Sequence, residues 1–324
     1  MTALLSVEDL RVVFRTESAL VKAVDGVSYD VEPGETVAIV GESGCGKSVS
    51  ALAVLGLVPT PPGEVTHGVI RFDGQDLLTL SEKEINDVRG RDIGMIFQEP
   101  MTSLNPVLTI GLQLSESTRR HLGLTRAQAT SRAIDLMNMV GIADPERRLK
   151  QYPHHLSGGM RQRVMIAIAL ACEPKLIIAD EPTTALDVTI QAQILELMKS
   201  LKDRLGVALV IITHNLGVVA RYADRVNVMY AGRVVEAGAT QDIYSRPQHP
   251  YTIGLLKSVP RMDQPHGERL VPIEGQPPDL ANLGIGCAYQ PRCKWATAPC
   301  SEPLEILDSN RDAHQSACIR RAEL

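Results

Sequence analysis

The stretch TVAIVGESGCGKSVSALAVLGLV, residues 36–58, decides the fold of this chain. An apolar run leads into GESGCGKS (41–48), which matches the pattern G-x-x-x-x-G-K-[ST], and an apolar helical segment follows. In such a strand–loop–helix, glycines let consecutive backbone N–H groups converge on phosphate oxygens, and the helix start adds about half a positive charge. We therefore predict a phosphate-binding loop, rather than a glycine-rich turn without a ligand.

We assign a nucleotide-binding role to each residue of this loop. We expect the Lys47 amine to reach the β and γ phosphates of a nucleotide and the Ser48 hydroxyl to ligate Mg²⁺. The other nucleotide-binding positions of the loop are Gly41, Glu42, Ser43, Gly44, Cys45 and Gly46.

A second apolar run, LIIADE (176–181), ends in two carboxylates. The carboxyl edge of a buried parallel strand is where ligands of α/β proteins bind. We expect Asp180 to hold Mg²⁺ through water and Glu181 to orient or deprotonate an attacking water molecule. Acidic residues at strand ends also cap turns, so this pair alone leaves both interpretations open.

Composition limits the class of protein. The 324 residues, 44% of them apolar and 22% charged, can form two domains with full cores. The net charge of −5 and the absence of a basic block argue against nucleic acid as the main partner. The apolar runs are too short for a membrane span, and the N-terminus does not resemble a signal peptide. We therefore expect a cytoplasmic chain.

Hydrophobic patterning predicts an α/β fold. Continuous apolar runs at 36–40, 176–180 and 207–213 are typical of parallel strands buried on both faces. Residues 10–14, LRVVF, alternate instead, and Asp73-Gly74 predicts a hairpin, so we expect an antiparallel part near the N-terminus.

Helical patterns occupy two regions. Apolar residues recur at helical spacing after Asp187, and a helical subdomain is expected at about 99–170. Within that subdomain Thr125 and Gln128 form a capping box, and Gly141 suits the helix end. A further helix starts in YPHHLSGGMRQRV (152–164), where unpaired N–H groups behind the serine and glycines suit an anion. The chain thus carries a second candidate phosphate-binding helix start.

These motifs share the order and approximate spacing of one known family. The phosphate loop, Gln98, LSGGMRQR (156–163), ADEPTTALD (179–187) and His214 resemble the motifs of ATP-binding cassette (ABC) ATPases over about residues 5–240. The resemblance implies a P-loop NTPase fold with a RecA-like core, an antiparallel β subdomain and a helical subdomain. It also implies ATP as the nucleotide.

The resemblance also implies roles for single residues. Gln98 corresponds to the glutamine that contacts Mg²⁺ and senses the transport domain, and His214 to the switch histidine at the γ-phosphate. The remaining correspondences are Ser157, Gly158 and Gly159 with the signature motif, Ala185-Leu186-Asp187 with the D-loop, and Phe14 with the aromatic that stacks on adenine. The residues alone leave simpler alternatives open, namely Gln98 as a plain loop residue, His214 as a hydrogen-bonded histidine at a strand end, and Phe14 as a core side chain.

In this family two ATPase domains pack head to tail, with each ATP between the P-loop of one domain and the signature helix of the other. The second anion-binding helix start would then serve a nucleotide held by a different chain. ATP would close the pair and hydrolysis would release it, which is a population switch. Glu181→Gln is accordingly expected to trap a closed, ATP-bound dimer.

The C-terminal part of the chain, together with the residues after Gln98, indicates a particular group within this family. Residues 246–261, 287–293 and 98–111 are similar to the ATPase subunits of bacterial dipeptide and oligopeptide importers. This implies an ABC ATPase domain at 1–240, an importer-type extension at 241–324, and a peripheral position on the cytoplasmic face of the inner membrane. The implied partners are two membrane-spanning permease subunits, a second ATPase and, indirectly, an extracytoplasmic solute-binding protein. The resemblance favours a paralogue as the second ATPase, and the sequence leaves an identical copy open.

Four cysteines fall in the last 38 residues, namely Cys287, Cys293, Cys300 and Cys318. In a reducing compartment such a cluster favours a metal site over disulfides, but the Cys-x-x-Cys pairs of common zinc and ferredoxin sites are absent. The alternatives are a [4Fe–4S] cluster, which the resemblance favours, Zn²⁺ with His314 as a substitute ligand, or unligated thiols.

Two other functions compete with peptide import. ATPase motifs do not contact the solute, so a nickel or glutathione importer or another transporter has the same pattern. A soluble ABC protein acting on DNA or ribosomes is disfavoured, because the chain lacks both a long coiled-coil insert and a second cassette.

Overall fold

The computed structural model describes residues 3–184, 186–258, 272–303 and 314–324, and these form two compact units. The first unit comprises Met1–Glu32, Thr36–Thr79 and Thr213–Leu324. The second comprises Pro33–Glu35 and Leu80–Ile212. Among the described residues, no helix combines the length and the apolar character that crossing a bilayer requires.

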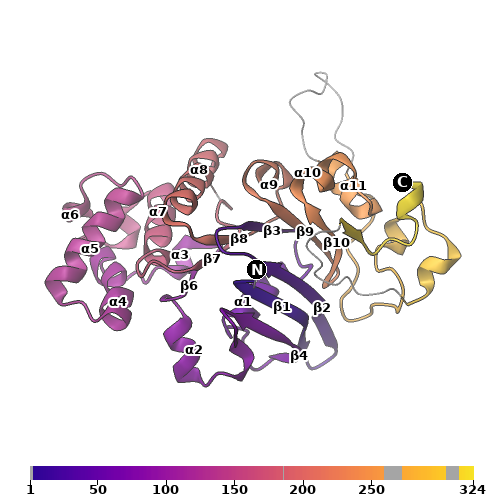
Figure 1. Ribbon diagram of the computed structural model, residues 1–324, viewed down its shortest axis with the longest axis horizontal. Coiled ribbons are helices and arrows are strands. Elements are labelled where there is room, and N and C mark those ends of the chain that lie inside the picture. The colour runs from indigo at the N-terminus through magenta and orange to yellow at the C-terminus, as the bar shows by residue number, and fades with distance from the viewer. Residues whose placement is uncertain (1–2, 185, 259–271, 304–313) are drawn as a thin grey trace. The chain divides into compact units, whose positions relative to one another are not determined.

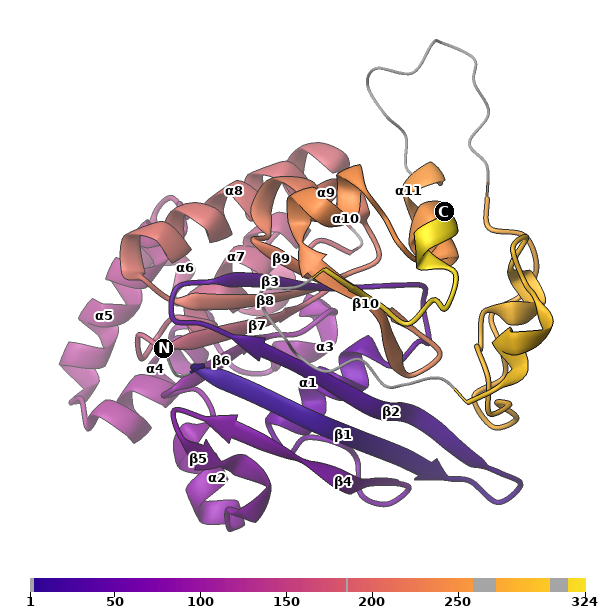
Figure 2. The ribbon, with the colours of Figure 1, turned by 45° about the vertical axis from the view of Figure 1, so that its right-hand side comes forward.

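The first unit contains an antiparallel sheet with the strand order β2-β1-β4-β5, in which β1, β2 and β4 run side by side (Figure 2). It also contains a second set of strands, in which β3 pairs in parallel with β9, and β10 pairs antiparallel with both β9 and β11. Its strands are β1 (Leu5–Arg15), β2 (Leu20–Val31), β3 (Thr36–Val40), β4 (Gly63–Phe72), β5 (Gln75–Asp76), β9 (Arg225–Tyr230), β10 (Arg233–Ala239) and β11 (Gln315–Ser316). Its helices are α1 (Lys47–Val54), α9 (Leu216–Tyr222), α10 (Thr240–Ser245) and α11 (Pro250–Lys257), with 3₁₀ turns at Leu77–Thr79, Gln290–Arg292, Ala298–Ser301 and Arg321–Glu323.

The antiparallel part and its hairpin are where the sequence predicts them. Asp73 and Gly74 connect β4 to β5 and both have positive φ, 50° and 84°, as a type I′ turn requires. The alternation in β1 is confirmed only in part. Leu10 and Val12 are fully buried and Arg11 between them is half-buried, but Val13 is also buried and Phe14 is half-buried, because the pairing with β2 shifts register between Val12 and Val13.

One apolar core joins β3 and β9 to helices from the C-terminal part of the chain. Tyr251 of α11 and Tyr289 are buried in the same cluster as Tyr230 of β9, with ring centroids 4.5–5.5 Å apart. The described part of the C-terminal region therefore packs against the strands of the first unit. The expected domain boundary at residue 240 remains a prediction.

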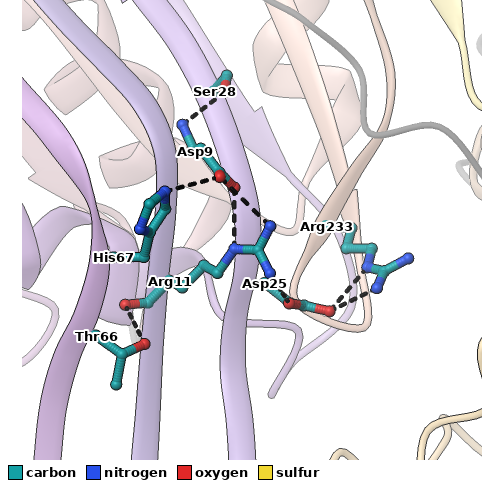
Figure 3. Close-up of polar contacts among 7 residues, drawn as sticks. All are labelled: Asp9, Arg11, Asp25, Ser28, Thr66, His67 and Arg233. Atoms are coloured by element: carbon teal, nitrogen blue, oxygen red, sulfur yellow. Dashed lines mark hydrogen bonds and ion pairs between the residues drawn. The ribbon is translucent and has the colours of Figure 1, made fainter.

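A series of contacting polar side chains links β4, β1, β2 and β10 (Figure 3). His67 lies 3.1 Å from Asp9, and Asp9 accepts a 3.0 Å hydrogen bond from Arg11. Arg11 lies 3.7 Å from Asp25, which accepts hydrogen bonds of 2.6 and 3.0 Å from Arg233. Only the Asp25 side chain is buried, at 8% exposure, so it carries most of the electrostatic stabilisation.

The second unit contains a parallel sheet, in which β7 lies between β6 and β8 (Figure 1). The strands are β6 (Ile93–Ile96), β7 (Leu176–Asp180) and β8 (Ala208–Thr213, whose last residue belongs to the first unit). The helices are α2 (Glu82–Val88), α3 (Pro100–Ser103), α4 (Ile110–Leu122), α5 (Arg126–Met139), α6 (Pro145–Arg148), α7 (Gly158–Ala169) and α8 (Val188–Leu205), with a 3₁₀ turn at Pro153–His155.

Local sequence explains these helices. Thr125 and Gln128 form the expected capping box of α5, and Gly141, with a φ of 71°, directly follows the C-cap Val140. Along α8 the centre of the predicted stripe is buried, at Ile194, Met198 and Leu201. Its other members are less covered, since Ile190 and Leu197 are half-buried and Leu205 is exposed.

We predict that Asp25→Asn lowers the free energy of unfolding by about 1–3 kcal/mol, because it weakens hydrogen bonds to a charged guanidinium at a buried site. Urea unfolding of the full chain measures this effect. Asp9→Asn is the matched control, since Asp9 is 41% exposed and asparagine tolerates its φ of 43°. An equal loss in both variants would contradict the dominance of Asp25.

Candidate active site

The phosphate loop connects β3 to α1 and is held tightly against neighbouring backbone. A Cβ atom on Gly41 would lie 2.2 Å from the Met229 carbonyl oxygen, and one on Gly46 would lie 2.1 Å from the Ala23 carbonyl oxygen. Both glycines also have positive φ, 155° and 99°. No residue with a side chain fits at either position, so the loop has the glycine-dependent shape that binds phosphate.

The Lys47 side chain lies within the curve of the loop. It is 4% exposed, and its Nζ donates hydrogen bonds of 2.9 Å to the carbonyl oxygens of Gly41 and Glu42. Ser48 is half-buried in the first turn of α1, while Ser43 and Gly44 are exposed. Cys45 is buried, which raises the pKa of its thiol. The loop therefore offers backbone N–H groups and one ammonium to an anion.

The two carboxylates predicted at the end of β7 are both buried. Asp180 is 6% exposed and Glu181 is 8% exposed. Glu181 has a φ of 44°, and its N–H donates to the Ile212 carbonyl oxygen at 2.8 Å, which fixes its backbone beside β8. Strained backbone of this kind is concentrated at functional sites.

Two donors orient the Glu181 carboxylate. Its Oε2 accepts hydrogen bonds from Gln98 Nε2 at 3.1 Å and from Thr184 Oγ1 at 2.8 Å. The structure thus brings together Gln98 and Glu181, whose sequence separation is 83. The sequence indicated no role for Thr184, although it lies inside ADEPTTALD. An oriented carboxylate at a strand end can position a water molecule or accept its proton.

The signature residues open α7. Ser157 caps the helix by accepting the Met160 N–H at 3.4 Å, and Ser157 and Gly158 are exposed. A Cβ atom on Gly159 would lie 3.0 Å from Ile190 Cγ2. This helix start therefore lies against the start of α8, with Ser157 and Gly158 exposed at its end.

The D-loop prediction is only partly covered by the structure. Asp187 caps α8, with its Oδ1 accepting the Ile190 N–H at 2.9 Å, whereas Ala185 lies outside the described residues. A Cβ atom on Gly158 would lie 3.6 Å from Leu186 Cδ2, so the D-loop and the signature motif are neighbours within one unit.

Phe14 and His214 belong to the first unit. Phe14 is half-buried on β1, and a Cβ atom on Gly63 of β4 would lie 3.0 Å from its ring. His214 directly follows β8 and is exposed. Their assigned roles toward a nucleotide remain predictions.

The predicted site residues are divided between the two units. The phosphate loop, Phe14 and His214 are in the first unit. The second unit holds Gln98, Ser157, Gly158, Gly159, Asp180, Glu181 and Asp187. Within the second unit, Gln98 contacts Glu181, and the signature motif lies beside the D-loop.

The four C-terminal cysteines line one small cavity of about 20 Å³, together with Trp295. Burial raises the thiol pKa of Cys287, Cys293 and Cys318. Nevertheless, within the described ranges, no three His, Cys, Asp or Glu side chains lie close enough together to hold a metal ion.

His314 does not line the cysteine cavity. Its Nε2 lies 2.7 Å from Glu236 Oε1, and its Nδ1 lies 3.2 Å from Gln248 Nε2. The side chain thus links β10 to the segment before α11 instead of serving as a substitute ligand for the cysteines.

Comparison with known families gives two matches. Residues 24–184 match the ABC transporter model, and residues 235–300 match the model of the oligopeptide/dipeptide transporter C-terminal region. The dipeptide transport ATP-binding protein DppD of Bacillus subtilis is 52% identical over 98% of this chain and 95% of its own length. The chain belongs to the ABC transporter family.

Other relatives agree with this assignment. The oligopeptide transport ATP-binding protein OppD of Bacillus subtilis is 54% identical over 91% of this ABC protein and 83% of its own length. Among solved structures, a dimeric post-hydrolysis state of the cassette MJ0796 bound to ADP and Pi has a TM-score of 0.66 and 27% identity. It covers 73% of this chain and 98% of its own. The expected family and P-loop ATPase fold are confirmed, and the chain is an ATP-binding and ATP-hydrolysing cassette.

We predict that Glu181→Gln lowers ATP turnover by about 10²–10⁴-fold, because the amide cannot accept a proton from water. Steady-state phosphate release by the full chain, together with its partners where these are required, measures this effect. Glu99→Gln, beside Gln98 but exposed, is the matched control and should keep the parental rate. Parental turnover in Glu181→Gln would show that another group activates water.

Proposed function

We propose that the chain is the ATP-hydrolysing subunit that powers import of dipeptides or oligopeptides through separate membrane-spanning subunits. The observation that carries this proposal is the combination of an ABC cassette with the C-terminal region at residues 235–300. The relatives DppD and OppD also support it, because they are 52% and 54% identical to this chain over 98% and 91% of its length. Nickel or glutathione import is the alternative, and a soluble non-transport role is less favoured.

For the proposed ATP site, each residue keeps the role that the sequence predicts. The loop N–H groups and Lys47 bind the phosphates, while Phe14 stacks on adenine. Glu181, oriented by Gln98 and Thr184, activates water, and His214 contacts the γ-phosphate. The backbone constraint on the loop and the two donors to Glu181 support this division of roles.

The donor set fits a magnesium ion. Ser48, Gln98 and Asp180 provide oxygen atoms, the ligands that Mg²⁺ prefers, and the Asp180 carboxylate is buried, where a cation partner stabilises it most. When bound, the ion neutralises charge on the phosphates.

The site is completed by a second ATPase, which we propose to be a paralogue. Its P-loop would hold the ATP that meets Ser157, Gly158 and Gly159 of this chain, while its own signature helix covers the ATP bound here. The exposed start of α7 supports this arrangement. ATP bridging then favours the closed pair, and hydrolysis removes the bridge.

Co-purification tests the proposed partners. Tagged full chain isolated from membranes should carry two multi-span permease subunits and a second, different ATPase, placing it at the inner face of the membrane. Peptide-stimulated ATP turnover by this assembly, with the solute-binding protein added, should exceed turnover with nickel or glutathione. Stimulation by nickel or glutathione alone would favour the alternative importer, and recovery of ribosomal proteins or DNA without permeases would contradict transport.

For the four cysteines we propose a shared metal site. Thiolate donors suit a [4Fe–4S] cluster, with Zn²⁺ as the alternative. The common cavity lined by all four thiols supports this proposal, although their arrangement does not meet the geometry of a metal site. A structural role fits best, because metal ligation stabilises short, loop-rich segments.

Anaerobic purification followed by iron, sulfide and zinc analysis tests this site. We expect about four iron and four sulfide per chain, with broad visible absorption. Cys293→Ser should reduce the metal content, whereas Cys172→Ser, outside the cavity, should not. A folded chain without iron or zinc would contradict any metal site.

A further inference from the structure

We propose that Arg292 is a positioning residue for the phosphate loop, and that it acts through the carboxylate of Glu42. Through this contact the C-terminal extension holds the loop in its binding conformation and thereby raises the affinity of the loop for ATP. Glu42 then serves as an attachment point of the loop.

The contact between the two side chains is bidentate. Arg292 Nη1 donates to Glu42 Oε2 at 2.7 Å, and Nη2 donates to Oε1 at 3.0 Å. The Arg292 side chain is 5% exposed and the Glu42 side chain 25% exposed, so solvent screens the pair less than a surface ion pair. Paired, charge-assisted hydrogen bonds of this kind fix orientation as well as distance.

Arg292 is itself held in place by the extension. Its Nε donates to the Glu274 carbonyl oxygen at 3.0 Å, and its Nη2 to the Ile273 carbonyl oxygen at 3.4 Å. The guanidinium carbon lies 5.9 Å from the ring centroids of both Tyr230 and Tyr289. Because these contacts fix the guanidinium, Glu42 is positioned by Arg292.

A second contact from the same part of the chain holds the backbone of Glu42. Its N–H donates to the Tyr251 hydroxyl at 2.8 Å, and Tyr251 is completely buried. The start of α11 is fixed by His249, whose Nδ1 accepts the Tyr251 N–H at 3.1 Å. Burial lowers the pKa of His249 to about 3, so the ring stays neutral and can accept this bond.

Glu42, fixed by these contacts, in turn helps to position Lys47. The carbonyl oxygens of Gly41 and Glu42 each accept a 2.9 Å hydrogen bond from Lys47 Nζ. A shift of Glu42 therefore moves the lysine amine as well as the loop backbone. This connects Arg292 to the phosphate-binding groups without any contact between Arg292 and the nucleotide.

Arg292 lies next to the cysteine cavity in the sequence of the extension. It ends the 3₁₀ turn Gln290–Arg292, and Cys293 follows directly. The turn begins where the Gln290 N–H donates to the Cys287 carbonyl oxygen at 2.9 Å. The cysteine cavity and the phosphate loop are therefore connected through one short segment.

Equilibrium binding of Mg·ADP to the full chain, together with KM and kcat for ATP in the assembled complex, tests the proposal. We expect Arg292→Gln and Glu42→Gln each to weaken nucleotide binding and raise KM about tenfold, while kcat changes less than about twofold. The double variant should bind no more weakly than either single variant, because both remove the same contact. Arg292→Lys should restore affinity only in part, since lysine keeps the charge but cannot bind bidentately.

Lys294→Gln is the matched control. Lys294 forms an ion pair of 3.2 Å with Glu274 in the same segment, but both side chains are more than 60% exposed. The affinity of the Lys294→Gln variant for nucleotide should equal that of the parent protein. If Arg292→Gln does not fold, Glu42→Gln carries the test, because it preserves size and leaves the extension unchanged. Parental affinity and KM in Glu42→Gln, or additive losses in the double variant, would overturn the proposal.

Discussion

The close approach between the phosphate loop and the carbonyl oxygens of Met229 and Ala23 is the constraint on which the site depends. A side chain at Gly41 or Gly46 would overlap backbone that belongs to β9 or β2, and backbone cannot move aside as a flexible side chain can. The loop is consequently shaped by the strands around it. Its N–H groups and the Lys47 amine are preorganised, which reduces the cost of ordering them when phosphate binds.

The C-terminal region adds a second constraint to the same loop. Its tyrosines complete the core beside β9, and its arginine and a tyrosine hydroxyl hold Glu42. Burying a guanidinium is costly unless it is paired, and here the carboxylate, two carbonyl oxygens and two aromatic rings compensate for that cost. The C-terminal region, which matches a separate family model, therefore packs against the phosphate loop and the strands beside it.

The sequence predicted those features that local patterns encode. The strand, loop and helix around residues 41–48, the Asp73-Gly74 hairpin and the capping box at Thr125 each depend on a few neighbouring residues, and the structure contains all three. The bond from Gln98 to Glu181 depends on how β6 and β7 pair, which periodicity does not specify. The bond from Thr184 to Glu181 is local, but no sequence pattern indicated it.

The pair of Arg292 and Glu42 could not be predicted for the same reason. Its members are separated by 250 positions, and neither belongs to a pattern that names the other. The cysteine spacing was equally uninformative, because the sequence does not show which loops bring thiols together. In both cases the missing information is long-range packing, which no window of residues contains.

We propose that one copy of this chain carries two unlike halves of nucleotide sites, the phosphate loop and the α7 start, and completes neither site alone. Phosphate release by the isolated full chain, measured over a wide range of protein concentration with mass determined in parallel, tests this most directly. We expect activity per chain to be negligible when the chain is monomeric and to rise only when a second ATPase chain assembles with it. Full activity in a strictly monomeric sample, unchanged by dilution, would contradict it.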